Sequence, residues 1–407
     1  MNTLARLAAA FAATLLLSAC GGGSGSSADA PPNFQVTAAD SSVIATWTAE
    51  PDVNYWIFYG AGTGITTTNW ATSGGRVITN ATSPQIITGL TNDQVYSFTI
   101  NGRKNGGPGG PGAPTVTASP RLAGNIWSLG PVLGTTRLRA VASGTVVAGL
   151  VQATVGEGGA IYTSVAGAAT TQNTNPASPN DLYAIAFGAP GFVATGANGT
   201  ILLGADGTNW TTTFSGTSRK LYGIASAVTQ FVVVGEGGVV LTSSDGNAWT
   251  QQNSGTSADL YGVAWGNNLY VAVGAGGTMI TSVDGITWSP VASGTTAALN
   301  SVALGQVTSG TTATNLWVAA GTNGTLVTSA DGAAWTASPA ISAATVNAIR
   351  WGGQFVAVGA GGTIFTSPDA VTWTLRPVAT TEDLFGIARL QTGYSVVGDK
   401  GTTAFSS

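Results

Sequence analysis

A glycine-marked phrase recurs seven times after residue 150, and this repetition constrains the fold more than any other feature of the sequence. The phrase follows the pattern Val-Gly-x-Gly-Gly-x-Ile, then Thr-Ser-x-Asp-Gly-x-x-Trp, and five copies keep both the Asp and the closing Trp. Its leading glycines are Gly156, Gly196, Gly235, Gly274, Gly321, Gly359 and Gly398, with steps of 40, 39, 39, 47, 38 and 39 residues. A period of this kind indicates one structural unit that is copied and stacked on itself.

Each unit contains four short β-type segments separated by turn residues. In the fourth copy they read LYGVAWG, LYVAVGAGG, TMITSVDG and ITWSPVASG. Four strands in a period near 40 are typical of a β-propeller blade. The sequence therefore predicts an all-β chain with a seven-bladed propeller over residues 121–407, and the step of 47 places an insertion between Gly305 and Asn315.

The two ends of the repeat region complement each other. The last copy stops at Ser407, before any Asp-Gly or Trp, so it lacks an outer strand. Trp127 precedes Leu138 by eleven residues, just as Trp249 precedes Leu260. We therefore predict a strand-swapped closure, in which the segment around Trp127 supplies the outer strand of the last blade and removes an open sheet edge.

The repeated phrase resembles the BNR or Asp-box repeat and the YVTN/BNR-like propellers, which include photosystem II assembly factors. The copy here has one residue fewer between Asp and Gly than the family pattern, as in SSDGNAW. The resemblance spans about 280 residues. It implies a propeller fold, and it implies little about activity because unrelated functions share this fold.

Residues 33–120 contain seven β-type runs with turn signals between them, which predicts an immunoglobulin-like sandwich. This segment resembles a fibronectin type III domain. Trp47 stands where that family keeps its core Trp, and Leu90 with Tyr96 matches the tyrosine corner. The domain is either a spacer between membrane and propeller or a ligand-binding module of its own.

The N-terminal segment predicts export. Arg6 precedes an apolar run from Leu7 to Leu17, which is too short to span a bilayer as a helix. The sequence Leu17-Ser18-Ala19-Cys20 resembles the lipobox of bacterial lipoproteins. That resemblance implies a signal peptide over residues 1–20 and lipidation of Cys20. An ordinary signal peptide with an incidental Cys is the alternative.

Gly21 follows the expected cleavage point, where an Asp would signal retention at the inner membrane. We therefore expect a lipid anchor in the outer membrane, with the protein facing the periplasm or the cell surface. Residues 21–32 are rich in Gly and Ser and predict a flexible linker.

Composition excludes several classes of function. Charged residues make up only 7% of the chain, the net charge is −4, and there is no His. A nucleic-acid-binding surface needs a basic stripe, which thirteen Lys and Arg over 407 residues do not supply. Imidazole catalysis and imidazole metal ligation are impossible without His. We expect no cofactor and no metal.

The phrase carries one Asp per repeat in five copies: Asp206, Asp245, Asp284, Asp331 and Asp369. An Asp in a tight Asp-Gly turn normally accepts backbone N–H bonds. These residues are predicted to be structural, one on each blade and too far apart to share an ion.

Charged side chains concentrate on the loops of one expected face, in the seventh, first, second and third blades. We call this set the charged arc: Arg137, Arg139, Glu157, Asp181, Arg219, Lys220, Glu236, Glu382, Asp383, Asp399 and Lys400. Two interpretations stay open. The arc is either a contact surface for a protein or glycan partner, or a set of solvated loops that hold the few charges of the chain.

Tyr183, Tyr222 and Tyr261 occupy one equivalent position in successive repeats, which Arg139, Asn300, Asn347 and Phe385 hold in the others. Three tyrosines in such a row can form a stacking platform for sugar rings. They can equally well pack against one another between blades.

The resulting prediction is a non-catalytic binding or scaffold lipoprotein of the cell envelope, whose propeller face engages a protein complex or a glycan. A sialidase-like or other glycan-active propeller enzyme is the alternative. Its chemistry requires clustered Arg and paired carboxylates, and the Arg residues of the repeats do not follow that pattern.

Overall fold

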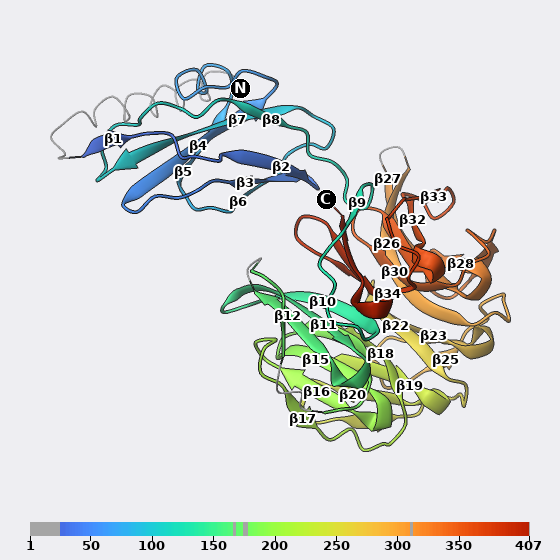
Figure 1. The fold of residues 1–407 in the computed structure, drawn as a ribbon. Coiled ribbons are helices and arrows are strands. Elements are labelled where there is room, and N and C mark those ends of the chain that lie inside the picture. The colour runs from blue at the N-terminus through green and yellow to red at the C-terminus, as the bar shows by residue number, and fades with distance from the viewer. Residues whose placement is uncertain (1–24, 166–167, 174–177, 310–311, 407) are drawn as a thin grey trace. The chain divides into compact units, whose positions relative to one another are not determined.

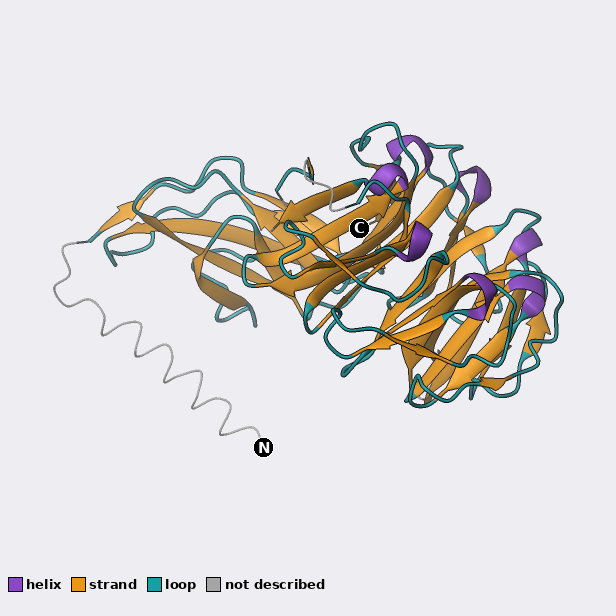
Figure 2. Cartoon of the chain, turned by 90° about the horizontal axis from the view of Figure 1, so that it is seen from below, coloured by secondary structure: helices purple, strands orange, loops and turns teal. Residues whose placement is uncertain are grey.

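The computed structural model describes residues 25–165, 168–173, 178–309 and 312–406 (Figure 1). The predicted signal peptide and Cys20 lie outside these ranges. The chain divides into two units, Met1–Leu122 and Ala123–Ser407. Both are built from strands, with short 3-10 turns in the second (Figure 2). Among the described residues, no helix has the length and apolar character needed to cross a membrane.

Two antiparallel sheets form the first unit. Its strands are β1 (Ser26–Ala28), β2 (Gln35–Ala39), β3 (Ser42–Thr46), β4 (Val53–Ala61), β5 (Arg76–Ala81), β6 (Gln85–Thr88), β7 (Tyr96–Lys104) and β8 (Val116–Ala118). One sheet has the order β2-β3-β6 and the other β1-β7-β4-β5, with β8 also paired to β7. Side chains from both sheets share one core, in which Val43 and Ile87 of the first sheet meet Ile57 and Phe98 of the second.

The two anchor residues expected in this unit, Trp47 and Tyr96, take part in its packing and hydrogen bonding. Trp47 directly follows β3, is buried, and packs edge-on against Tyr55 with 5.6 Å between ring centroids. The hydroxyl of Tyr96 accepts a hydrogen bond from the backbone N–H of Thr91 at 3.2 Å, which is the backward bond of a tyrosine corner.

The flexible linker predicted for residues 21–32 needs correction, because Ser26–Ala28 forms strand β1 and pairs with β7. Backbone hydrogen bonds need no particular side chain, so a Gly/Ser-rich segment can still add a strand to an edge. Glycine residues also leave the space that the added strand needs. A Cβ atom on Gly25 would collide with the backbone of Gly107, and a Cβ atom on Gly110 would collide with that of Ala28.

The described part of the second unit contains seven four-stranded antiparallel sheets. Six of them follow chain order from their first strand to their fourth. They are β10 (Leu138–Val146), β11 (Gly149–Gly156), β12 (Ile161–Val165), β13 (Thr171–Gln172); β14 (Leu182–Gly188), β15 (Gly191–Gly196), β16 (Ile201–Gly204), β17 (Thr211–Thr213); β18 (Leu221–Ser226), β19 (Phe231–Gly235), β20 (Val240–Ser243), β21 (Thr250–Gln252); β22 (Leu260–Gly266), β23 (Leu269–Gly274), β24 (Met279–Ser282), β25 (Ser289–Pro290); β26 (Leu299–Ser309), β27 (Thr312–Gly321), β28 (Leu326–Ser329), β29 (Thr336–Ser338); and β30 (Val346–Trp351), β31 (Phe355–Gly359), β32 (Ile364–Ser367), β33 (Thr374–Leu375).

The seventh sheet joins both ends of the unit. It consists of β34 (Leu384–Arg389), β35 (Tyr394–Gly398), β36 (Thr403–Ser406) and β9 (Trp127–Leu129), in that order. Strand β9 pairs antiparallel with β36, and Trp127 lies opposite Ser406. The predicted swap of an upstream strand into the last sheet is therefore present.

The first strands of the seven sheets contact one another in a closed cycle, which runs from β10 through β14, β18, β22, β26, β30 and β34 back to β10. Hydrophobic clusters lie between adjacent sheets; one of them contains Ala142 of the first sheet with Ile185 and Trp210 of the second. The predicted insertion lengthens one hairpin, since β26 and β27 pair over ten residues from Leu299 to Ser309. These features define a β-propeller.

A 3-10 turn follows the second strand of every sheet, and it explains why the phrase is rich in glycine. The turns are η1 (Glu157–Gly159), η2 (Ala197–Gly199), η3 (Glu236–Gly238), η4 (Ala275–Gly277), η5 (Thr322–Gly324), η6 (Ala360–Gly362) and η7 (Asp399–Gly401). The last glycine of each turn has a φ angle of 64–76°, which disfavours a side chain. A Cβ atom on Gly277 would also collide with the carbonyl oxygen of Thr295.

Candidate functional site

A β-bulge occurs at the same position near the start of every innermost strand. In the first sheet the pairing of β10 with β11 shifts between Leu138 and Ala140. We call the seven bulged residues the bulge ring: Arg139, Tyr183, Tyr222, Tyr261, Asn300, Asn347 and Phe385. A bulge re-aims a side chain relative to a regular strand. All seven line one central cavity of about 540 Å³.

Five members of the bulge ring are in continuous contact. The ring centroids of Tyr183 and Tyr222 lie 5.6 Å apart, and those of Tyr222 and Tyr261 lie 5.5 Å apart. The guanidinium carbon of Arg139 lies 5.7 Å from the ring centroid of Tyr183 and 5.2 Å from that of Phe385. Since the tyrosine rings meet each other at 40° and 68°, they favour packing over a flat stacking platform.

The two asparagines of the bulge ring connect neighbouring sheets through their side chains. The Nδ2 atom of Asn300 donates to the carbonyl oxygen of Val346 at 2.9 Å. The Nδ2 atom of Asn347 donates to the carbonyl oxygen of Leu384 at 2.8 Å. A polar residue at this position thus replaces aromatic packing with a bond to the next innermost strand.

The tyrosine hydroxyls of the bulge ring stay protonated at neutral pH. Burial raises the pKa of Tyr222 to about 12, and the carboxylates of Asp259 and Glu236 add to the effect. Burial also raises the pKa values of Tyr183 and Tyr261. Each hydroxyl can therefore donate one hydrogen bond and accept others in the central cavity.

Part of the predicted charged arc forms one ion-pair cluster. Arg137 pairs with Asp399, and the Nη1 atom of Arg137 lies 3.5 Å from the Oε1 atom of Glu157. Arg139 donates from Nη2 to the same Glu157 oxygen at 2.8 Å. The hydrogen bond to Asp399 raises the pKa of Arg137. Beside this cluster, Lys400 pairs with Glu382 at 2.8 Å.

Aspartates in the loops before the innermost strands, inside and outside the arc, hold the 3-10 turns in place. Asp181 accepts from the backbone N–H of Gly158 at 2.8 Å, and Asp383 accepts from that of Gly361 at 2.8 Å. Asp259 does the same for Gly237 at 2.7 Å. Each bond joins the loop before one innermost strand to the turn of the preceding sheet.

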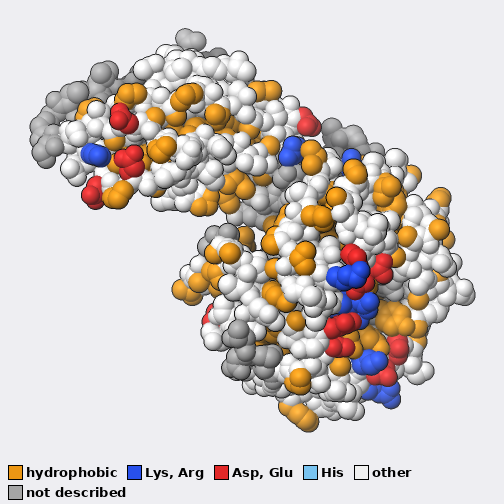
Figure 3. All heavy atoms as spheres, in the orientation of Figure 1, with side chains coloured by type: hydrophobic (Ala, Val, Ile, Leu, Met, Phe, Trp, Pro, Cys, Tyr) orange, Lys and Arg blue, Asp and Glu red, His pale blue; other side chains and the backbone are white. Residues whose placement is uncertain are grey.

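The third-sheet members of the arc lie apart from the ion-pair cluster. The backbone N–H of Lys220 donates to Glu236 at 3.1 Å, while the side chains of Arg219 and Lys220 are exposed. No ion pair in the described chain includes either side chain. Figure 3 shows the charged side chains gathered in one band on the second unit.

The repeated aspartates are structural, as predicted. The Oδ1 atom of Asp284 accepts from the backbone N–H groups of Ile286 and Thr287, both at 2.8 Å. Trp288 then donates its indole N–H to the carbonyl oxygen of Gly285. Asp206, Asp245, Asp331 and Asp369 accept the same pair of backbone bonds. Within the described ranges, no group of three or more Cys, Asp or Glu residues is placed to hold a metal ion.

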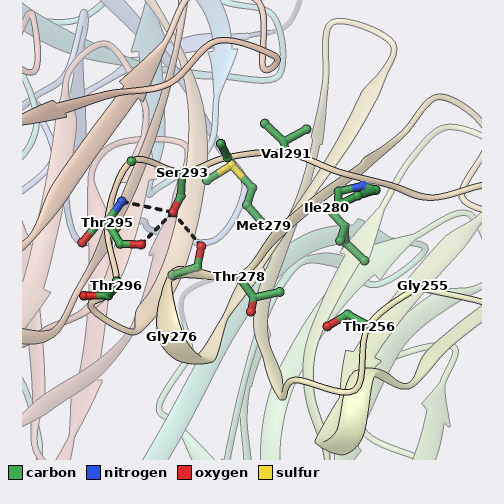
Figure 4. Close-up of a pocket in the computed structure, with 14 residues that line it drawn as sticks. Gly255, Thr256, Gly276, Thr278, Met279, Ile280, Val291, Ser293, Thr295 and Thr296 are labelled. Carbon is green, nitrogen blue, oxygen red and sulfur yellow. Dashed lines mark hydrogen bonds between the residues drawn. The ribbon is translucent and has the colours of Figure 1, made fainter.

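A groove of about 800 Å³ lies on the second unit beside η4 (Figure 4). Thr278 and Met279 line it together with Ser293 and Thr295, and none of its lining residues is ionisable. The hydroxyl of Ser293 is bonded to the carbonyl oxygens of Gly277 and Thr295. The other polar side chains of the groove are neutral threonine hydroxyls, so its lining offers no acid, base or charged group.

The central cavity also contains two cationic residues that sequence reasoning did not select, Arg350 and Arg389. A comparison of the seven innermost strands position by position reveals both, because other sheets have uncharged residues there. The cavity lining includes three arginines and, among the described residues, no Asp or Glu.

Comparison with known proteins supports the fold. No protein-family model and no curated protein matches the chain. YCF48 from Cyanidioschyzon merolae is similar in structure, with a TM-score of 0.53 and 17% identity over 69% of this chain and 98% of that chain. YCF48 bound to D1 peptide gives a TM-score of 0.54 and 16% identity, over 70% and 97% of the two chains.

Virginiamycin B lyase from Staphylococcus aureus has a TM-score of 0.56 and 10% identity, over 69% of this chain and 99% of that chain. Likenesses at such low identity concern the fold. They show that the second unit is a β-propeller of a kind that proteins with different activities share.

Proposed function

We propose that this chain is a non-catalytic binding or scaffold protein of the cell envelope, and that the propeller engages a protein partner. The bulge ring and the charged arc carry the proposal. Together they place aromatic, amide and charged side chains at and beside the central cavity, in a chain of which only 7% of the residues are charged. Aromatic residues and Arg are the side chains that most often anchor protein interfaces.

The proposed architecture is a fibronectin type III-like domain followed by a seven-bladed propeller. The two-sheet core and the Tyr96 bond support the first part. Seven four-stranded sheets in a closed cycle support the second. In such an arrangement the first domain serves as a spacer and the propeller presents the binding face.

Binding fits the residues of the site better than catalysis. The chain has no His. Glycoside hydrolysis requires two carboxylates at a suitable separation, whereas the described lining of the cavity holds none. The acidic residues of the arc are engaged in ion pairs or in backbone bonds.

A peptide-binding propeller has a precedent in the same fold, since YCF48 has been observed bound to D1 peptide. By analogy in fold alone, we propose a protein partner over a glycan. The mutual packing of the three tyrosines, which leaves no flat platform, also favours this choice.

We further propose that the protein is anchored through lipidated Cys20 in the outer membrane. The lipobox-like residues and Gly21 support this location. Replacing Cys20 with Ser should abolish incorporation of labelled palmitate and release the protein from the membrane fraction. Retention of the label in the C20S variant would refute the anchor without bearing on the propeller.

Affinity capture from solubilised membranes tests the binding proposal. Arg139, Arg219 and Lys220 are changed together to Glu, and recovered proteins are compared with those bound to the wild type. A control in which Arg76, Lys104 and Arg376 become Glu has the same net charge, with the changes outside the arc. Loss of one protein complex only in the arc variant supports the proposal. Equal capture by both variants overturns it.

Reversal at Arg139 also removes its ion pair with Glu157, so a second variant guards against misfolding. Arg219 and Lys220 are both exposed and are changed to Ser without loss of an ion pair. Weaker capture by this variant at an unchanged melting temperature supports a direct contact. A glycan array run in parallel identifies the alternative, because binding to sugars alone would favour a glycan-binding propeller.

A further inference from the structure

Arg350 breaks the strictest pattern of the seven innermost strands. Counting from the start of each strand, the fifth position holds Ala in the other six sheets: Ala142, Ala186, Ala225, Ala264, Ala303 and Ala388. Four of these alanines are buried between neighbouring sheets. A guanidinium group does not fit into that space, and the side chain of Arg350 instead extends into the central cavity, where it is exposed.

The other two arginines of the cavity have partners within the protein. Arg139 is paired with Glu157 at 2.8 Å. Arg389 donates from Nη1 to the carbonyl oxygens of Leu390 and Gly393, at 2.7 and 2.6 Å, and packs over the ring of Tyr394. Each guanidinium is thereby held on the wall of the cavity.

Arg350 differs from both. Its guanidinium group forms no hydrogen bond and no ion pair with any residue that the structure describes. A guanidinium has five N–H donors and stays charged in proteins. With no carboxylate on the described cavity lining, the guanidinium group of Arg350 is left without an ionic partner and is open to a ligand.

Two tryptophans also belong to the lining of this cavity. The indoles of Trp265 and Trp351 belong to its lining, and neither has a hydrogen-bond partner in the described residues for its N–H group. The rings themselves are fixed against Tyr270 and Phe355, with centroid separations of 4.2 and 4.6 Å. The cavity thus combines one unpaired guanidinium group with aromatic side chains that are fixed in its wall.

We propose that the central cavity is a binding site for a small molecule that carries a carboxylate or phosphate group, and that Arg350 binds this oxyanion. The planar fork of arginine matches two oxygens of such a group and forms charge-assisted hydrogen bonds with them. A volume of about 540 Å³ suits a ligand of metabolite size.

The electrostatic surroundings of Arg350 agree with this assignment. The Arg350 side chain is exposed to the cavity, yet the surrounding sheets desolvate it in part and thereby lower its pKa. A cation in such a place loses part of its hydration, and an oxyanion compensates for that loss. Although the net charge of the protein is −4, no carboxylate among the described cavity-lining residues can compensate for the charge of Arg350.

Thermal unfolding of the full-length protein, titrated with sodium phosphate and separately with sodium acetate, tests the site. Sodium chloride at equal ionic strength is the reference, because a ligand that binds only the folded state raises the melting temperature with a saturable dependence on concentration. We expect such a rise for the wild type with at least one of the two anions. Arg350→Gln should weaken binding by about tenfold or more, since hydrogen bonds to charged groups are lost.

Three variants complete the design. Arg350→Lys keeps the charge without the fork and should bind with intermediate affinity. Arg376→Gln, directly after β33 and outside the cavity lining, and the Ser variant of Arg219 and Lys220 should respond as the wild type does. The proposal is overturned if R350Q responds like the wild type, or if neither anion exceeds chloride. A line-broadening titration of inorganic phosphate by phosphorus NMR gives the same readout without reference to unfolding.

Discussion

Arg137 forms an ion pair with Asp399, and this pair connects the residue before β10 to η7, the last 3-10 turn in the described residues. The two residues are 262 positions apart in sequence. Trp127, which lies opposite Ser406 in the shared sheet, makes a second connection between the same two regions. Two interactions therefore join the ends of the propeller: the ion pair between Arg137 and Asp399, and the pairing of β9 with β36 in the last sheet.

The ion pair should contribute less to stability than the strand. About a third of the Arg137 side chain and a fifth of the Asp399 side chain are exposed, and exposed pairs contribute about 0.2–1 kcal/mol. A double-mutant cycle with R137Q and D399N in urea should give a coupling free energy within that range, and added salt should reduce it. A coupling several times larger, unaffected by salt, would contradict this estimate.

Removal of the closing strand should be costly. Trp127 is 9% exposed, packs near Tyr394 and donates its indole N–H to the carbonyl oxygen of Gly124 at 2.7 Å. Truncation of a buried Trp to Ala typically costs about 3–5 kcal/mol. We expect W127A, and deletion of residues 125–130, to lower the melting temperature by several degrees.

Leu129 offers the matched control for this experiment. It belongs to the same strand, but its side chain is 46% exposed, so L129A should change the melting temperature little. Equal destabilisation by both substitutions would mean that the strand itself matters and the Trp side chain does not. An unchanged melt after deletion would exclude the closure as a source of stability.

Acid should weaken the propeller through the aspartates of its turns. Burial opposes ionisation of Asp206, but backbone hydrogen bonds from Asn209 and Thr208 lower its pKa to about 2. The unfolded chain has the usual value near 3.8, so the unfolded state takes up the proton first as pH falls. The stability that Asp206 contributes is therefore complete above that value and is lost as pH falls toward 2.

The D206N variant isolates this contribution, since Asn keeps an oxygen acceptor and does not titrate. Urea unfolding of both proteins across the acid range should show a wild-type advantage at neutral pH that disappears near pH 2. The backbone hydrogen bond from Thr287 likewise lowers the pKa of Asp284, so D284N should follow the same direction. A difference that is constant with pH would show that the carboxylate charge plays no part.

The repeat period revealed the propeller and its closure because each repeat contains glycines that the backbone requires. Gly277 has a positive φ angle and lies against the carbonyl oxygen of Thr295, so no other residue fits without strain. Trp127 was recognisable because its distance from Leu138 matches that of Trp249 from Leu260. Both signals depend on local spacing, which a sequence displays directly.

The seven residues of the bulge ring were recognisable as one equivalent repeat position, but the bulge itself and strand β1 were not predictable in the same way. A bulge follows from the pairing of two strands, and the sequence of β10 alone does not show that Arg139 is the displaced residue. Strand β1 depends on the free edge of β7 and on room beside Gly110, which only the folded first unit provides. The position of Arg350 was not predictable either, because the cavity exists only once the seven innermost strands form a closed cycle. The described lining of that cavity holds no carboxylate.

Alkaline titration should identify Tyr222 within the bulge ring. Burial raises its pKa to about 12, above the value near 10 of an exposed tyrosine, so the folded state disfavours the phenolate. The corresponding stability is complete below pH 10 and is lost as pH rises through about 12. The tyrosinate absorbance of the wild type minus that of Y222F should therefore have its midpoint near 12. Since the Tyr222 hydroxyl has no partner among the described residues, Y222F should leave the melting temperature at neutral pH unchanged. A difference curve with its midpoint near 10 would show that this hydroxyl is solvated like that of an exposed tyrosine. It would contradict the burial of Tyr222 in the wall of the central cavity.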